Sequence, residues 1–226
     1  MEYPPLAVVI PAGGLSTRFG SNKLLADLTG QSVFERTIQS FVDLAFVKQT
    51  VVPIGDSGSL SVVRRESGPP LRTCNAGANR AESVRNGLLA IDESFEWVAI
   101  HDAARPLVSQ ALIERVFDAA LRRGCAAPAL PVSLTIKQAT GPLPAHVEKT
   151  VPRRHLWAMQ TPQIMRRDAL LDAYRRCQID LNDVTDDVQL MELAGHDVWL
   201  VPGDERNIKI TTPLDLIVAK AILSER

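Results

Sequence analysis

Short apolar runs alternate with segments of helical periodicity along this chain. Several runs have the length and the residue types of buried strands. The strands we expect are Leu6–Ile10, Gln49–Pro53, Leu71–Cys74, Trp97–His101, Ala126–Pro131, Val198–Val201 and Ile208–Ile210. This alternation is typical of a Rossmann-like α/β fold, in which a mostly parallel sheet carries helices on both of its faces.

Capping residues mark where helices should begin. Ser32, Asn79 and Thr212 each stand three residues before an acidic side chain, which is the spacing of a capping box. Ser109 is expected to cap a further helix, which should end at Gly124 because glycine readily adopts the conformation that closes a helix.

Residues 133–155 interrupt the alternation. Two segments with a period of two, Ser133–Lys137 and His146–Val151, flank a turn that contains two prolines. We therefore expect a single domain spanning residues 1–226, from which residues 133–155 project as a β-arm. A two-stranded arm is marginally stable alone, so this one is expected to pack against a second copy of the chain.

Composition limits the classes of function. The chain has 226 residues, of which 46% are hydrophobic and 23% are charged, as in an ordinary globular enzyme. A net charge of −1 gives no general attraction for nucleic acid, and no apolar run reaches the length of a membrane span. The three cysteines are widely spaced without a C-x-x-C pair, which favours a reduced, cytoplasmic protein over a disulfide framework or zinc site.

The first predicted strand leads into a loop of small residues. Ala12-Gly13-Gly14 opens the loop, which then presents Arg18 and Lys23. Glycines let backbone N–H groups approach an anion closely, and the two cations add full charges, so we interpret the loop as a cradle for a triphosphate. The spacing matches neither the P-loop nor the dinucleotide fingerprint. A glycine-rich turn with two solvated cations is the alternative.

Other candidate residues follow later strands. Asp102 and Arg105 come after the strand that ends near His101, at the edge where open parallel sheets bind ligands. A local ion pair between them is the alternative. We assign His101 a structural role, because a single histidine is poor evidence for a metal site. Lys209 lies on the last predicted strand, where a phosphate could bind, although a lysine in an apolar strand usually reaches solvent.

A second small-residue turn, Gly77-Ala78, runs into the helix capped by Asn79. Gly77 permits close approach of a base or ribose, and Ser83 offers a hydrogen bond to it. Arg80 is either part of the same site or a solvated residue at the start of the helix.

The arm and the residues after it offer a second set of polar groups. Thr135, Arg153 and Thr161 could bind another anionic ligand. For Arg153 the alternative is a solvated basic cluster with the two residues that follow it.

Taken in order, these segments resemble one family over essentially the whole chain. The motifs are A-G-G-x(4)-R-x(4)-K, G-A-x-R-x-x-S-V, H-D-A-A-R-P, T-P-Q, T-D-D and N-I-K-x-T. Their order resembles the 2-C-methyl-D-erythritol 4-phosphate cytidylyltransferases of the non-mevalonate isoprenoid pathway. The resemblance implies a fold of the nucleotide-diphospho-sugar transferase type and transfer of CMP from CTP to 2-C-methyl-D-erythritol 4-phosphate. The products would be 4-diphosphocytidyl-2-C-methyl-D-erythritol and pyrophosphate.

The resemblance also implies roles for individual residues. Arg18, Lys23 and Lys209 would be the catalytic cations. The implied CTP site comprises Ala12, Gly13, Gly14, Gly77, Ala78, Arg80, Ser83 and Asp102. The implied methylerythritol phosphate site comprises Asp102, Arg105, Thr135, Arg153, Thr161 and Lys209. Thr135 and Arg153 would reach the site from the arm of a partner in a homodimer with exchanged arms. Mg²⁺ would be held mainly by phosphates, with no dedicated protein ligands.

Other functions are compatible with parts of the pattern. The run Asn22–Leu25 is also typical of molybdopterin cytidylyltransferases, and ribitol-5-phosphate cytidylyltransferases share the loop and the arm. Pro11 and Pro152 also depart from the usual pattern of the family. A catalytically inactive nucleotide-sensing domain of the same fold is the alternative from another class. Such a domain would be expected to lose at least one of the three catalytic cations, yet all are present.

Overall fold

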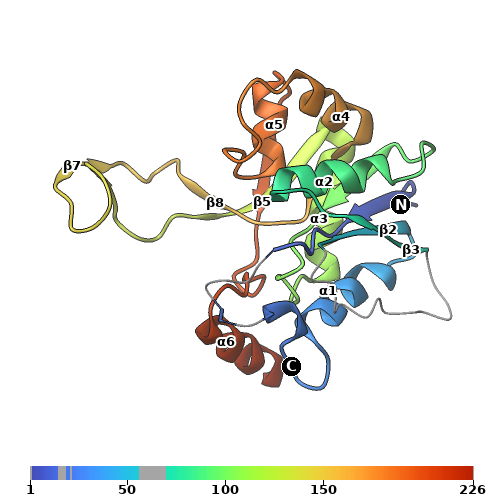
Figure 1. Ribbon diagram of the computed structural model, residues 1–226, viewed down its shortest axis with the longest axis horizontal. Helices are drawn as coiled ribbons and strands as arrows, with labels where there is room; N and C mark the ends of the chain where they lie inside the picture. The colour runs from blue at the N-terminus through green and yellow to red at the C-terminus, as the bar shows by residue number, and fades with distance from the viewer. Residues whose placement is uncertain (1, 15–18, 21, 56–69, 226) are drawn as a thin grey trace.

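The computed structural model describes residues 2–14, 19–20, 22–55 and 70–225. Within these residues one eight-stranded sheet forms the centre of the domain, and an arm extends to one side of it (Figure 1). The strands of the sheet are β1 (Leu6–Val9), β2 (Val47–Ile54), β3 (Leu71–Asn75), β4 (Trp97–Ile100), β5 (Cys125–Pro131), β8 (Trp157–Met159), β9 (Gln163–Arg166) and β10 (Trp199–Pro202).

The sheet is mostly parallel. Its strand order is β10-β5-β9-β4-β1-β2-β3, with β8 paired to β5 outside this path. β1 lies parallel to both β2 and β4, and β10 lies parallel to β5. β9 is inserted antiparallel between β4 and β5, and β8 runs antiparallel to β5. The predicted fold class is therefore confirmed.

Helices cover both faces of the sheet. α1 (Val33–Val42) and α3 (Gln110–Arg123) pack on one face, and α6 (Pro213–Ser224) joins the same core through Ala219; α2 (Arg80–Leu89), α4 (Arg167–Arg176) and α5 (Asp187–Leu193) pack on the other face. Side chains of β1 alternate accordingly: Leu6 and Val8 join the first core, and Ala7 and Val9 join the second. None of the helices in the described residues has the length and apolar character needed to cross a membrane.

The predicted helix starts are correct. Ser32 and Thr212 each form a complete capping box with the acid three residues later. Asn79 accepts a hydrogen bond from the N–H of the third residue of α2. Ser109 caps α3, and Gly124 closes that helix with a φ of +87°.

One predicted strand is wrong, and two strands were not predicted. Ile208–Ile210 forms no strand, because the segment lies against the loop after β4 rather than beside another strand. The N–H of Ile210 donates to the carbonyl of Ala104 in that loop (2.8 Å). β8 and β9 lie between the arm and α4, where the sequence shows no clear strand pattern. They are the strands that carry the chain back from the arm into the sheet.

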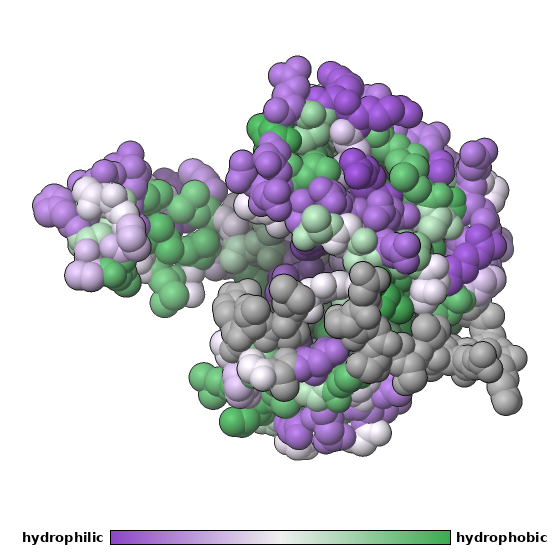
Figure 2. All heavy atoms as spheres, viewed as in Figure 1, coloured by the Kyte–Doolittle hydropathy of each residue, from purple (hydrophilic) through white to green (hydrophobic). Residues whose placement is uncertain are grey.

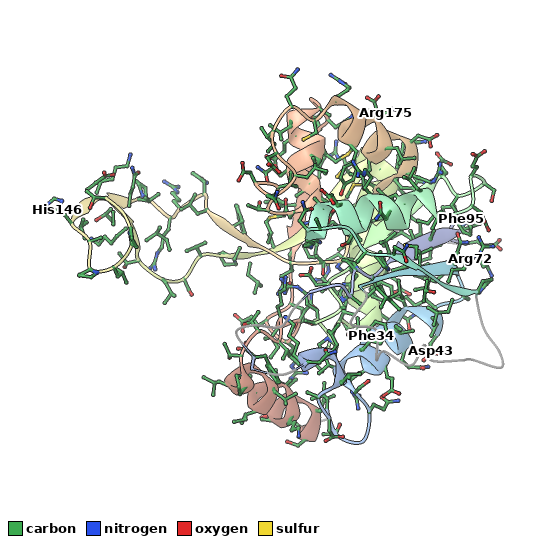
Figure 3. The ribbon with its side chains drawn as sticks, viewed as in Figure 1. Phe34, Asp43, Arg72, Phe95, His146 and Arg175 are labelled. Carbon is green, nitrogen blue, oxygen red and sulfur yellow. The ribbon has the colours of Figure 1, made fainter. Side chains whose placement is uncertain are left out.

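The arm includes β6 (Ile136–Ala139) and β7 (Val147–Val151), which pair antiparallel. Figure 3 places His146 at its far end, away from the domain. Hydrophobic side chains gather along the arm in the space-filling view (Figure 2). Leu134 is 74% exposed and Leu143 is 89% exposed. Apolar surface of this extent is consistent with packing against another molecule, which stays a prediction.

Candidate active site

A cleft of about 410 Å³ lies where several parallel strands end. Its walls come from the loop after β1, the turn before α2, the loop after β4 and the segment before α6. The lining residues are Pro11, Ala12, Gly13, Gly14, Lys23, Leu24, Gly77, Ala78, Asn79, Arg80, Ser83, Asp102, Ala103, Ala104 and Lys209. Ligands of open α/β sheets bind at this edge, and the volume suits a small molecule.

The turn at Gly77 is shaped by its contacts with α2. Ser83 Oγ accepts the N–H of Gly77 (3.0 Å) and donates to the carbonyl of Asn79 (2.8 Å). A Cβ added to Gly77 would lie 2.1 Å from the Cβ of Glu82, so no side chain fits there. By contrast, a Cβ on Gly14 would meet no atom of the described residues within 4 Å. Gly77 is therefore required by the protein's own packing, whereas the described residues place no such constraint on Gly14.

Lys23 is brought to the cleft by a short 3₁₀ helix, η1 (Lys23–Leu25). Asn22 caps this helix by accepting the N–H of Leu24 at 3.2 Å. Leu24 anchors it, since its side chain is only 4% exposed. Arg18 lies outside the described residues.

Three cations surround Asp102. Its Oδ1 lies 3.3 Å from Nε of Arg80, and its Oδ2 lies 2.9 Å from Nζ of Lys209 and 3.2 Å from Nε of Arg105. Burial alone raises the pKa of Asp102, but Arg80, Lys209 and Arg105 together hold it far below its usual range. Asp102 is therefore a fixed negative charge that organises cations at the cleft.

His101 and Thr161 hold the backbone of Asp102 in place. Nε2 of His101 lies 3.1 Å from the carbonyl of Arg105, so this nitrogen carries the proton. Burial lowers the pKa of His101 to about 4, which keeps the ring neutral and leaves Nδ1 as an acceptor. Oγ1 of Thr161 donates to Nδ1 (3.1 Å) and accepts the N–H of Asp102 (3.0 Å). Thr161 thus lies within the wall behind Asp102 and does not line the cleft.

Arg105 also lies behind the cleft. Besides Asp102, its guanidinium donates to the carbonyl of Asn207 (2.9 Å) and to that of Met159 (3.3 Å). Nδ2 of Asn207 in turn donates to the carbonyl of Thr161 (2.8 Å). These bonds fix the segment that carries Lys209. Substrate contact for Arg105 and Thr161, which the family resemblance implies, stays a prediction.

The arm residues of the same chain stand apart from the cleft. Thr135 and Arg153 are exposed and do not line it. Nη1 of Arg153 donates to the carbonyl of Ser133 at the base of the arm. A role for either residue in the cleft therefore requires a second copy of the chain.

Sequence reasoning missed the partner of Arg80. Nη2 of Arg80 lies 2.9 Å from Oδ2 of Asp187, which is completely buried at the start of α5. Arg80 is therefore not a solvated residue at the start of α2. The T-D-D motif contains Asp187 but does not indicate which residue it contacts.

Comparisons with known proteins agree on one family. The family model for 2-C-methyl-D-erythritol 4-phosphate cytidylyltransferase matches residues 6–225. The chain is 40% identical to the enzyme of that name from Gloeobacter violaceus, covering 96% of this chain and 95% of the relative. It is 38% identical to that from Rhodopirellula baltica, covering 97% and 95%.

Solved structures lead to the same family. The crystal structure of 2-C-methyl-D-erythritol 4-phosphate cytidylyltransferase from Thermus thermophilus has a TM-score of 0.77 and 33% identity, covering 97% of this chain and 99% of that one. The 4-diphosphocytidyl-2C-methyl-D-erythritol synthase from Anaerococcus prevotii has a TM-score of 0.83 and 25% identity, covering 98% and 99%.

Proposed function

Because the chain belongs to the 2-C-methyl-D-erythritol 4-phosphate cytidylyltransferase family, we propose that its cleft is the place where CMP passes from CTP to that sugar phosphate. The activity itself is that of the family, a nucleotidyltransferase of isoprenoid synthesis that releases pyrophosphate. The observation that carries the proposal is the cluster around Asp102, where Arg80 and Lys209 line the cleft and share one carboxylate.

The glycine-containing turns suit the nucleoside part of CTP. Ala12–Gly14 and Gly77-Ala78 line the cleft with little side-chain bulk. Backbone groups in such turns can hydrogen-bond a base or ribose at close range. Ser83 supports this site by closing the turn at Gly77.

The cations suit the triphosphate. Lys23 lines the cleft at the start of η1, and Arg18 precedes it in the same loop. An ammonium group acts as a point charge, whereas a guanidinium can bind two phosphate oxygens at once. We assign both residues to the phosphates of CTP and to the charge that develops during transfer.

The reaction requires positioning more than proton transfer. An oxygen of the sugar phosphate attacks the α-phosphorus of CTP, the bond from that phosphorus to the bridging oxygen breaks, and pyrophosphate leaves with the electron pair. A phosphate monoester is anionic at neutral pH and needs no general base. The cleft agrees, since Asp102 is its only carboxylate among the described lining residues and stays ionised between cations. Lys209 and Lys23 would then stabilise the transition state electrostatically.

Mg²⁺ would bind at this site together with CTP. Among the described residues, no three His, Cys, Asp or Glu side chains come together as metal ligands. Mg²⁺ often binds largely through substrate phosphates, and Asp102, the carboxylate of the described cleft lining, already pairs with three cations. Phosphate oxygens would supply most of its ligands, and the ion would neutralise phosphate charge during transfer.

The arm completes the site in a homodimer. Thr135 and Arg153 are exposed on the arm, away from the cleft of their own chain. We assign them to the methylerythritol phosphate in the cleft of the partner, with Asp102 and Lys209 facing it from this side. Arg105 and Thr161 then act by holding Asp102. A cytoplasmic location, where CTP is available, is consistent with three free cysteines.

A substrate panel tests the proposal. Pyrophosphate release is measured with CTP and Mg²⁺ in the presence of 2-C-methyl-D-erythritol 4-phosphate, ribitol 5-phosphate or reduced molybdopterin. We expect release with the first acceptor and background rates with the others. Release with ribitol 5-phosphate or molybdopterin alone would overturn the assignment, and release with none would favour a nucleotide-sensing domain.

A further inference from the structure

Arg80 is held between two carboxylates that differ in exposure. Its Nε faces Oδ1 of Asp102 at 3.3 Å, and its Nη2 faces Oδ2 of Asp187 at 2.9 Å. The Asp187 side chain is 0% exposed, whereas that of Arg80 is 28% exposed and lines the cleft. The guanidinium is thus held from behind by one carboxylate while its remaining surface faces the proposed CTP site.

Asp187 is itself fixed by buried neighbours. Oε1 of Gln163 accepts the N–H groups of both Asp187 and Val188 at 3.0 Å. The hydroxyl of Tyr174 lies 3.5 Å from Oδ1 of Asp187 and donates to the carbonyl of Ala81 at 2.9 Å. Gln163 on β9 thus fixes the backbone at Asp187. The carboxylate of Asp187 is completely buried beside Tyr174 of α4, where Arg80 is its charged partner.

The helix that carries Asp187 does not need this carboxylate for its own start. Asp186 already caps α5 by accepting the N–H of Gln189 at 3.0 Å. An ion pair with one fully buried partner is also weak evidence for a gain in stability, because removing the charges from water costs free energy that offsets much of their attraction. With helix capping and stability set aside, the role that the contacts of Asp187 support is to orient Arg80.

We propose that Asp187 is a positioning residue that aims the guanidinium of Arg80 at the phosphates of CTP. The inference rests on the proposed function, because it assumes that CTP occupies this cleft. Arg80 begins α2 and Asp187 begins α5, so their ion pair links the N-termini of two helices on the same face of the sheet. A planar guanidinium has donors for both carboxylates and keeps further N–H groups for an anion.

A double-mutant cycle tests this inference. The dissociation constant of CTP and the kinetic constants are measured for wild type, Asp187→Asn, Arg80→Gln and the double variant. Asp187→Asn is expected to weaken CTP binding roughly tenfold or more, the range for a lost hydrogen bond to a charged group. If Asp187 acts through Arg80, the same change adds little in the Arg80→Gln background.

Matched controls separate orientation from charge and folding. Asp186→Asn removes a negative charge one residue away and keeps a capping side chain, so CTP binding should stay within about twofold of wild type. The inference would be overturned if Asp187→Asn weakened CTP binding by the same factor with Arg80 present and in the Arg80→Gln background. It would also be overturned if Asp187→Asn alone bound CTP as tightly as wild type. If Asp187→Asn does not fold, Asp187→Glu replaces it: it keeps the charge but displaces the carboxylate, and wild-type affinity would again contradict the proposal. Failure of the wild-type protein to bind CTP would refute the proposed function instead.

Discussion

The ammonium group of Lys209 lies 2.9 Å from Oδ2 of Asp102, and both side chains line the same cleft. The lysine side chain is 38% exposed, so an anion can still approach it. Asp102 fixes the position of Lys209, and Arg80 and Arg105 are the other two cations that pair with the Asp102 carboxylate. This arrangement places a solvent-accessible positive charge where the carboxyl ends of parallel strands meet.

Lys209→Ala should lower kcat/KM by about 10²–10³, the usual loss for one donor that stabilises transition-state charge. The melting temperature should stay close to that of wild type, because Asp102 keeps two cationic partners. Lys220→Ala is the matched control, since Lys220 pairs with Asp27 at 3.5 Å on the surface. Steady-state kinetics and thermal unfolding check both variants, and equal activities would refute a role for Lys209.

The two glycine positions should respond in opposite ways to the same change. Gly77→Ala should lower the melting temperature, because the new Cβ would lie 2.1 Å from the Cβ of Glu82. Gly14→Ala should leave the melting temperature unchanged, since no described residue lies within 4 Å of its added Cβ, yet it should weaken CTP binding by filling space in the cleft. Differential scanning fluorimetry and a CTP titration distinguish the two. Equal losses of stability would contradict this reading of the turns.

Much of the fold follows from local signals in the sequence. Apolar runs and capping residues such as Ser32 and Thr212 act within a few positions, so the starts of α1, α2, α3 and α6 were predicted correctly, whereas those of α4 and α5 were not predicted. Ile208–Ile210 was predicted wrongly, because an apolar segment becomes a strand only when another strand lies beside it. β9 was missed because its position between β4 and β5 depends on pairing across the whole domain.

In the candidate site, too, local signals predicted some features, and tertiary contacts determine the rest. The end of β4 indicated Asp102, and a predicted strand that does not form indicated Lys209; both residues line one cleft. The contact between Arg80 and Asp187 joins two distant helix starts, and no local pattern specifies it. Likewise, the position of Thr161 behind Asp102 depends on a tertiary hydrogen bond rather than on spacing.

The buried ring of His101 should make the protein sensitive to acid. In the unfolded chain His101 titrates near 6.5, whereas burial lowers its pKa in the folded protein to about 4. Between these pH values the unfolded state therefore binds one more proton than the folded state. The free energy of unfolding is highest above pH 6.5 and declines as the pH falls towards 4. The expected loss is about 3 kcal/mol over this window.

Urea unfolding at several pH values between 7 and 4 measures this effect. His101→Asn should be less stable at neutral pH, because the ring fills a buried space. Its free energy of unfolding should nevertheless decline less steeply with acid than that of wild type, since the titrating group is gone. Identical slopes would show that His101 is not responsible.

Mixing two inactive variants tests whether the arm of one subunit serves the cleft of the other. Lys23→Ala impairs the cleft and leaves the arm intact, whereas Arg153→Ala does the reverse. Co-expressed, the two chains should form heterodimers with one complete site each, restoring about one quarter of wild-type activity under random pairing. If the activity is no greater than that of the two variants assayed separately, the arm of one subunit does not contribute to the cleft of the other.

We propose that the cations of this cleft carry out cytidylyl transfer. The most direct test is the rate at which Lys23→Ala forms 4-diphosphocytidyl-2-C-methyl-D-erythritol from saturating CTP and 2-C-methyl-D-erythritol 4-phosphate, beside wild type and with folding checked by thermal unfolding. We expect a kcat lower by at least about 10²-fold with an unchanged melting temperature. A near-normal kcat in the folded variant would contradict it.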